Sequence, residues 1–80
     1  MYDEIMAIMI EKIAEIAQVD PDTLTPDTSF EDDLGVTSME LAGMVAAIEE
    51  EYDTYLEYTK LIHGDTIGEV AEIIVDIIEN

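Results

Sequence analysis

Ser38 is the residue whose sequence context best supports chemistry at a hydroxyl group. Thr37 and Glu40 have the three-residue spacing of a helix capping box, in which a Thr hydroxyl and a Glu carboxylate each accept a hydrogen bond from the other residue's backbone N–H. With Thr37 as the cap, Ser38 is predicted to be the first residue of a helix, beside free backbone N–H groups and the positive end of the helix dipole. That position stabilises a phosphate ester on the hydroxyl. Gly35 could allow the tight turn that leads the chain to the helix.

Other kinds of reactive site find little support in the sequence. The chain has no cysteine, which excludes disulfides, thiolate metal sites and cysteine nucleophiles. The Gly-x-Ser-x-Gly elbow of serine hydrolases is also absent, so Ser38 is not expected to be a hydrolase nucleophile. The single histidine, His63, is expected in a solvated turn, the alternative being a pH-sensitive contact near Gly64 and Asp65. Residues 20–22 lack the glycine and the terminal glutamate of an EF-hand loop, so no specific metal site is expected, although acidic clusters can bind divalent cations weakly.

Charge and length restrict the function classes further. The 80 residues include 21 Asp plus Glu but 2 Lys plus Arg, which gives a formal net charge of −19. A chain this acidic is a poor candidate for binding nucleic acid or an anionic membrane surface. The apolar fraction of 49% is too high for an acidic disordered tail, and the length allows one core, so we predict a single domain over residues 1–80. The longest apolar run, residues 5–10, is too short to span a membrane, and no signal-peptide pattern is present, so a cytoplasmic protein is expected.

The elements that must position Ser38 follow from the spacing of apolar residues. This spacing predicts three longer helices, over residues 2–18, from about Ser38 to about Tyr52, and from Thr66 toward the end of the chain, with one short helical turn near residues 57–62. Thr66 and Glu69 form a second capping-box pattern. Residues 19–37 contain two prolines and are predicted to form a long first loop. The predicted fold class is all-α, a small four-helix bundle. Five apolar residues are expected to anchor the loop to the core: Val19, Leu24, Phe30, Leu34 and Val36.

The second predicted helix has an unusual surface. Its core stripe is expected to be formed by Leu41, Val45, Ile48 and Tyr52. The opposite side carries small and apolar residues where the other helices carry acids: Met39, Gly43, Ala46 and Ala47. Acidic residues border this strip: Glu31, Asp32, Asp33, Glu40, Glu49, Glu50, Glu51 and Asp53. One interpretation is only that alanine favours helix. The other is an apolar docking strip whose acidic rim attracts basic partners quickly and weakly.

Residues 30–41 read Phe-Glu-Asp-Asp-Leu-Gly-Val-Thr-Ser-Met-Glu-Leu, and residues 48–53 read Ile-Glu-Glu-Glu-Tyr-Asp. These stretches closely resemble the attachment site and the end of the second helix of acyl carrier proteins, whose pattern is an acidic run, Leu-Gly, two residues, then Ser followed by Leu or Met. Length, charge, the long loop and the helix layout agree with that family over essentially the whole chain. The resemblance implies a non-catalytic carrier in which Ser38 is esterified with 4′-phosphopantetheine from coenzyme A by a phosphopantetheinyl transferase (holo-acyl-carrier-protein synthase).

The resemblance also implies what such a carrier does. The prosthetic thiol would carry acyl groups as thioesters between enzymes of fatty-acid, polyketide or related biosynthesis, and acyl chains could be sheltered between the helices. The carrier would act as a monomer, and its partners would be acyl-transfer, condensing or adenylating enzymes with basic docking patches. The cofactor-binding residues would be Ser38, Gly35 and Thr37, and the docking residues would be Asp33, Met39, Glu40, Ala46, Glu49 and Glu50.

Some residues depart from the family pattern. Thr37 stands where many members have Asp, and Gly43 stands where Glu is common. Tyr55 and Tyr58 are unusual in a connector that often carries acids. These departures suggest a specialised carrier in place of the housekeeping fatty-acid one. The alternative that charge alone would allow is a non-catalytic acidic interaction protein, such as a nucleic-acid mimic or inhibitor, without a prosthetic group.

Overall fold

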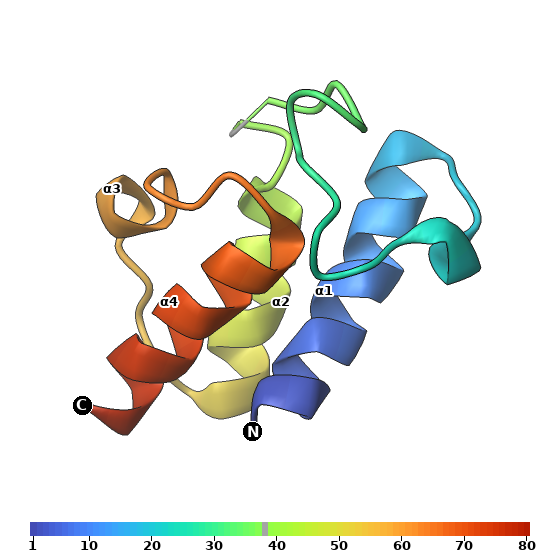
Figure 1. The fold of residues 1–80 in the computed structure, drawn as a ribbon. Helices are drawn as coiled ribbons and strands as arrows, with labels where there is room; N and C mark the ends of the chain where they lie inside the picture. The colour runs from blue at the N-terminus through green and yellow to red at the C-terminus, as the bar shows by residue number, and fades with distance from the viewer. Residues whose placement is uncertain (38) are drawn as a thin grey trace.

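The computed structural model describes residues 1–37 and 39–80. Within these residues, four α-helices and one 3-10 turn follow one another: α1 (Tyr2–Ala17), η1 (Pro21–Thr23), α2 (Ala42–Tyr52), α3 (Tyr58–Leu61) and α4 (Ile67–Glu79). Helix α1 packs against both α2 and α4, and the short α3 packs against α4 (Figure 1). The predicted all-α bundle of three longer helices and one short helix, with a long first loop, is therefore confirmed.

Helix α1 forms because its apolar residues recur at helical spacing and its acids lie on the other side. Its buried residues are Ile5, Met6, Met9, Ile13 and Ala14. The helix ends where Gln18 takes a left-handed conformation with φ 58°, which lets its N–H bond to the carbonyl of Ala14. This end agrees with the predicted boundary. Within the described ranges, no helix combines the length and the apolar character that crossing a membrane requires.

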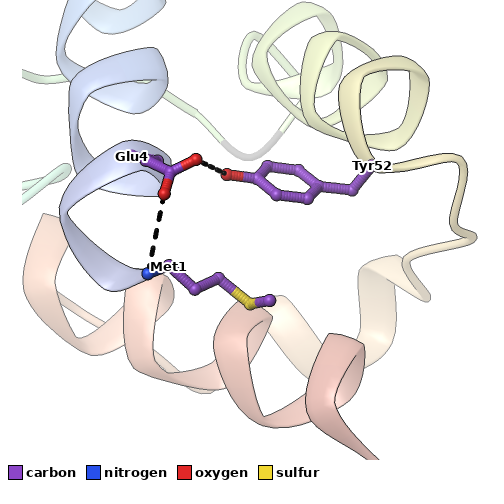
Figure 2. Close-up of polar contacts among 3 residues, drawn as sticks. All are labelled: Met1, Glu4 and Tyr52. Carbon is purple, nitrogen blue, oxygen red and sulfur yellow. Dashed lines mark hydrogen bonds and ion pairs between the residues drawn. The ribbon is translucent and has the colours of Figure 1, made fainter.

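The Glu4 carboxylate connects the start of α1 to the end of α2. The hydroxyl of Tyr52 donates a hydrogen bond to Oε2 of Glu4 at 3.4 Å, and the amino group of Met1 lies 3.8 Å from Oε1 of the same side chain (Figure 2). Glu4 therefore joins two helices that are far apart in the sequence.

Helix α4 begins as its sequence predicts. The hydroxyl of Thr66 accepts a hydrogen bond from the N–H of Glu69 at 3.2 Å, and the Glu69 carboxylate accepts one from the N–H of Thr66 at 3.2 Å. The capping box is thus complete at the first turn. The buried residues of the helix are Ile67, Gly68, Val70, Ala71 and Ile74. Ile77 and Ile78, near the end of the helix, are half-buried.

The predicted start of the second helix near Ser38 is wrong for the residues that the structure describes. Helix α2 begins at Ala42, and residues 39–41 form turns ahead of it. The Thr37–Glu40 pair does exchange the expected hydrogen bonds, at 3.2 and 3.4 Å. However, the N–H groups of Glu40 and Ala42 bond to carbonyls three residues back, and the four-residue bonding of an α-helix is first seen from Val45 to Leu41. A capping box needs only a three-residue spacing, which a turn satisfies as well as a helix.

The long first loop is fastened to the start of α4. Backbone hydrogen bonds run from Phe30 N–H to the Asp65 carbonyl at 3.1 Å and from Ile67 N–H to the Thr28 carbonyl at 3.0 Å. Gly68 lies so close to the loop that a Cβ there would sit 2.9 Å from the carbonyl oxygen of Pro26.

The five predicted loop anchors do not behave alike. Leu24, Phe30 and Val36 are buried, and Leu34 is half-buried. Val19 is 37% exposed, so its prediction as an anchor is wrong. Its backbone N–H is held by the Ala14 carbonyl at the end of α1, which keeps Val19 at the surface.

Candidate functional site

The segment that leads to Ser38 is held in place by its own hydrogen bonds. The Asp33 carboxylate accepts a hydrogen bond from the N–H of Ser29 at 2.7 Å, and the Ser29 hydroxyl accepts one from the N–H of Asp32 at 3.2 Å. Gly35 has φ 64°, a left-handed conformation that costs glycine little. The next residue, Val36, is buried and bonds through its N–H to the Phe30 carbonyl at 3.0 Å. The chain therefore leaves the core at Thr37, which is exposed.

Ser38 itself lies outside the described residues, and its predicted place as the first residue of a helix lies outside them too. Its sequence neighbours Thr37 and Met39 are both exposed, Met39 at 85%. Such neighbours give a large partner access to this part of the chain. No basic residue occurs between Lys12 and Lys60 in the sequence. The segment therefore offers a phosphate group no ion pair with a basic side chain of its own.

The residues predicted to form a docking face are mostly at the surface. Asp33, Glu40, Ala46 and Glu50 are exposed, as is Met39. The structure also exposes two apolar side chains that the sequence did not assign to this face, Tyr55 at 74% and Ile62 at 56%. Both follow α2 in the chain, and Tyr55 was already unusual for its position.

Glu49 differs from the other predicted docking residues. It is half-buried, and its Oε2 accepts a hydrogen bond from the backbone N–H of Leu56 at 2.9 Å. Leu56 is itself buried. Glu49 therefore has a structural role that its spacing on the helix did not suggest, and its docking role stays a prediction.

A cavity of about 320 Å³ lies beside this segment, between the first loop, α2 and α3. Two of its lining residues, Val36 and Leu41, stand on either side of Ser38 in the sequence. Tyr58 also lines it, and the Tyr58 hydroxyl is buried and has no hydrogen-bond partner in the part of the chain that the structure describes. This burial raises the pKa of Tyr58 above its ordinary value. In the sequence, Tyr58 is notable only as an unusual connector residue, although its spacing from Leu61 places both residues on one side of the short helix.

His63 lies in the turn after α3 and is exposed, as predicted. Among the described residues, no group of three or more His, Cys, Asp or Glu side chains is arranged to hold a metal ion.

Comparison with known proteins identifies the family. A family model described as "Phosphopantetheine attachment site" matches residues 7–74. The fold is similar to the NMR structure of the HMG-ACPI domain from the CurA module of Lyngbya majuscula, with a TM-score of 0.75 and 26% sequence identity over 98% of this chain and 78% of that one. These matches agree with the acidic Leu-Gly-x-x-Ser pattern and give no support to an acidic inhibitor without a prosthetic group. Proteins of this kind depend on a phosphopantetheinyl transferase and on partner biosynthetic enzymes. The chain belongs to the phosphopantetheine-binding family as an acyl carrier protein, a non-catalytic carrier whose cofactor is 4′-phosphopantetheine.

Proposed function

We propose that Ser38 is the residue esterified with 4′-phosphopantetheine, and that the chain carries acyl groups on it as thioesters between biosynthetic enzymes. The observation that carries this proposal is the arrangement of the chain before Ser38. Residues 29–36 are fixed to the bundle, and the chain then becomes exposed at Thr37 and Met39. A transferase can therefore reach the exposed residues on either side of Ser38, and hydrogen bonds attach the preceding loop to the bundle.

The residues around the segment that contains Ser38 are compatible with covalent attachment of the cofactor. When attached, the cofactor supplies a thiol that forms thioesters. Ser38 supplies the oxygen for the phosphodiester bond, and the acids nearby, Glu31, Asp32 and Glu40, offer the phosphate no attraction. The arm is therefore tethered by one covalent bond and is free to turn toward different enzymes. The adjoining cavity between the first loop, α2 and α3 offers room for its far end.

We further propose that the carrier serves polyketide-type assembly and not the housekeeping fatty-acid pathway. Three departures from the common carrier pattern support this proposal: Thr37 before the serine, Gly43 on α2, and the tyrosines Tyr55 and Tyr58. The likeness to a carrier domain of the CurA module points the same way. Its partners would be acyl-transfer and condensing enzymes with basic patches that match the acidic surface around Ser38.

Intact mass spectrometry tests the attachment residue. We expect incubation with coenzyme A and a broad-specificity phosphopantetheinyl transferase to add one phosphopantetheine group to the wild-type chain. Ser38→Ala should gain none. The chain has one other serine, Ser29, and Ser29→Ala is the matched control that should still gain the group. An unmodified wild type with every transferase tried, or a modified Ser38→Ala, would contradict the proposal.

A further inference from the structure

The buried hydroxyl of Tyr58 has no hydrogen-bond partner among residues 1–37 and 39–80, which the structure describes. Burying a hydroxyl without a partner costs free energy, and folded proteins leave few such groups. A phenylalanine would fill the same space without this cost. The hydroxyl is therefore a candidate for a bond to something that enters the protein from outside.

Tyr58 is the first residue of α3 and lines the cavity between the first loop, α2 and α3. The cavity volume of about 320 Å³ is at the lower end of the range for small-molecule pockets. The lining is mixed: Ser29, Glu31, Asp32 and Asp65 bring polar groups to it, and the apolar side chains include Phe30, Val36, Leu41, Met44, Val45 and Leu61. The apolar part of the lining suits a short acyl group, and the Tyr58 hydroxyl is an uncharged polar contact beside it that lacks a partner among the described residues.

The cavity is also placed where a tethered group can reach it. Val36 and Leu41 both line it, and they lie two residues before and three residues after Ser38 in the sequence. Residues on both sides of Ser38 in the sequence therefore line this cavity, which supports its use by a group attached at Ser38.

We propose that, when the acyl group carried on Ser38 lies in this cavity, the Tyr58 hydroxyl forms a hydrogen bond with an uncharged oxygen of that group. The carrier would then shelter hydroxyacyl or oxoacyl groups in preference to hydrocarbon groups of the same length. This inference rests on the proposed attachment at Ser38.

The restriction to an uncharged oxygen follows from the acids at the same cavity. Glu31, Asp32 and Asp65 are among its lining residues, and the chain as a whole carries a net charge of −19. A carboxylate on the cargo would be repelled by these acids and would lose its hydration on entry. A hydroxyl or a ketone loses much less hydration and pairs with the tyrosine.

Loading matched cargoes tests this specificity. Coenzyme A analogues with an amide in place of the thioester would be used to attach butyryl, 3-hydroxybutyryl and succinyl groups, with intact mass confirming each product. We expect 3-hydroxybutyryl to raise the Tm of the carrier above the butyryl form by about 4 °C, the shift that one net hydrogen bond produces in a domain of this size. Succinyl should give no gain over butyryl. Hydrogen exchange of the α3 amides should slow most with 3-hydroxybutyryl.

Tyr58→Phe should abolish the difference between the 3-hydroxybutyryl and butyryl forms. Its unloaded form should be at least as stable as the wild type, because the unpaired hydroxyl is gone. Tyr55→Phe is the matched control, since Tyr55 is 74% exposed and should leave the difference unchanged. Equal Tm values for the two cargoes in the wild type, or an intact preference in Tyr58→Phe, would overturn the inference. Absence of any mass gain on loading would instead show that the attachment proposal fails.

Discussion

The carboxylate of Glu49 accepts a hydrogen bond from the backbone N–H of Leu56, with 2.9 Å between Oε2 and N. Glu49 lies near the end of α2, and Leu56 is buried in the connector to α3. Asp53 takes a left-handed conformation with φ 49° between them, and the N–H of Thr54 bonds to the Glu49 carbonyl at 3.1 Å. The side-chain carboxylate and the backbone carbonyl of Glu49 thus both accept hydrogen bonds from the connector that leads to Tyr58.

Glu49→Ala should lower the free energy of unfolding by about 1–2 kcal/mol, because the buried N–H of Leu56 would lose a charged acceptor. Urea unfolding monitored by circular dichroism measures this change. Glu50→Ala is the control: Glu50 is exposed, and its substitution should change stability by less than about 0.5 kcal/mol. Equal effects of the two substitutions would show that the Glu49–Leu56 bond contributes nothing.

The parts of this fold that were predictable are those that local sequence decides. The apolar spacing of α1 and the Thr66–Glu69 box at α4 depend on residues within one or two turns, and both are confirmed. The start of α2 was misplaced because the Thr37–Glu40 motif is equally satisfied in a turn. Tertiary packing then decides where the α-helical bonds begin.

The candidate site divides in the same way. Ser38 and the exposed Met39 were predictable from a motif that is contiguous in the sequence. The Glu49–Leu56 hydrogen bond and the unpaired, buried hydroxyl of Tyr58 could not be predicted from the sequence. Both depend on how the connector between α2 and α3 packs against the bundle. Helical periodicity does not predict which side chain will accept a hydrogen bond from a backbone N–H seven residues away.

Two glycines should respond to alanine in opposite directions. Gly68→Ala places a Cβ 2.9 Å from the Pro26 carbonyl oxygen, so the loop must move away from α4, and we expect a loss of about 1–3 kcal/mol of unfolding free energy. Gly43 is exposed in α2 with nothing within 4 Å of an added Cβ. Gly43→Ala should therefore stabilise the protein by about 0.5–1 kcal/mol through helix propensity. Thermal unfolding of both variants gives the comparison, and a stable Gly68→Ala would contradict the close contact.

The free energy of unfolding should decrease at alkaline pH because two tyrosines, Tyr52 and Tyr58, ionise. Partial burial, together with the charge and hydrogen bond of Glu4 and the charge of Glu51, raises the pKa of Tyr52, and burial raises the pKa of Tyr58. Above a pH of about 10 the unfolded chain loses these protons first. The folded state then binds more protons, so the free energy of unfolding decreases as pH rises from about 10 through the higher folded pKa values.

Urea unfolding at several pH values from 9 upward measures this slope. The double variant Tyr52→Phe, Tyr58→Phe should lose stability less steeply than the wild type over this window. Tyr55→Phe changes an exposed ring and should follow the wild type. Identical slopes for the wild type and the double variant would show that neither phenol contributes to the loss.

Salt should stabilise this bundle. The described residues contain two ion pairs, Met1–Glu4 at 3.8 Å and Lys12–Glu15 at 4.0 Å, against a net charge of −19. The Cα dimensions are 31 × 21 × 19 Å. At 10 mM salt the screening length of about 30 Å lets acids repel one another across the whole molecule, whereas at 150 mM it is about 8 Å.

We therefore expect the Tm to rise between 10 and 150 mM NaCl, and to rise with millimolar Mg²⁺. The variant Glu72→Gln, Glu79→Gln removes two exposed charges from α4 and should show a smaller rise. Differential scanning calorimetry measures both. A Tm that does not change with either salt would mean that self-repulsion is not a significant destabilising force.

The acidic face and Met39 should affect partner binding through different rate constants. Glu50→Lys should lower the association rate with a phosphopantetheinyl transferase by roughly threefold to tenfold at low salt, because Glu50 is exposed and acts through long-range attraction. Met39→Ala should instead raise the dissociation rate by about tenfold, because an apolar side chain that is 85% exposed can be buried only in the complex. Neither change should alter the free energy of unfolding by more than about 0.5 kcal/mol.

Glu79→Lys makes the same charge change at the end of α4, far from residues 29–37 (Figure 1), and should leave the association rate nearly unchanged. If Glu79→Lys slowed association as much as Glu50→Lys, total charge and not a docking face would govern the encounter.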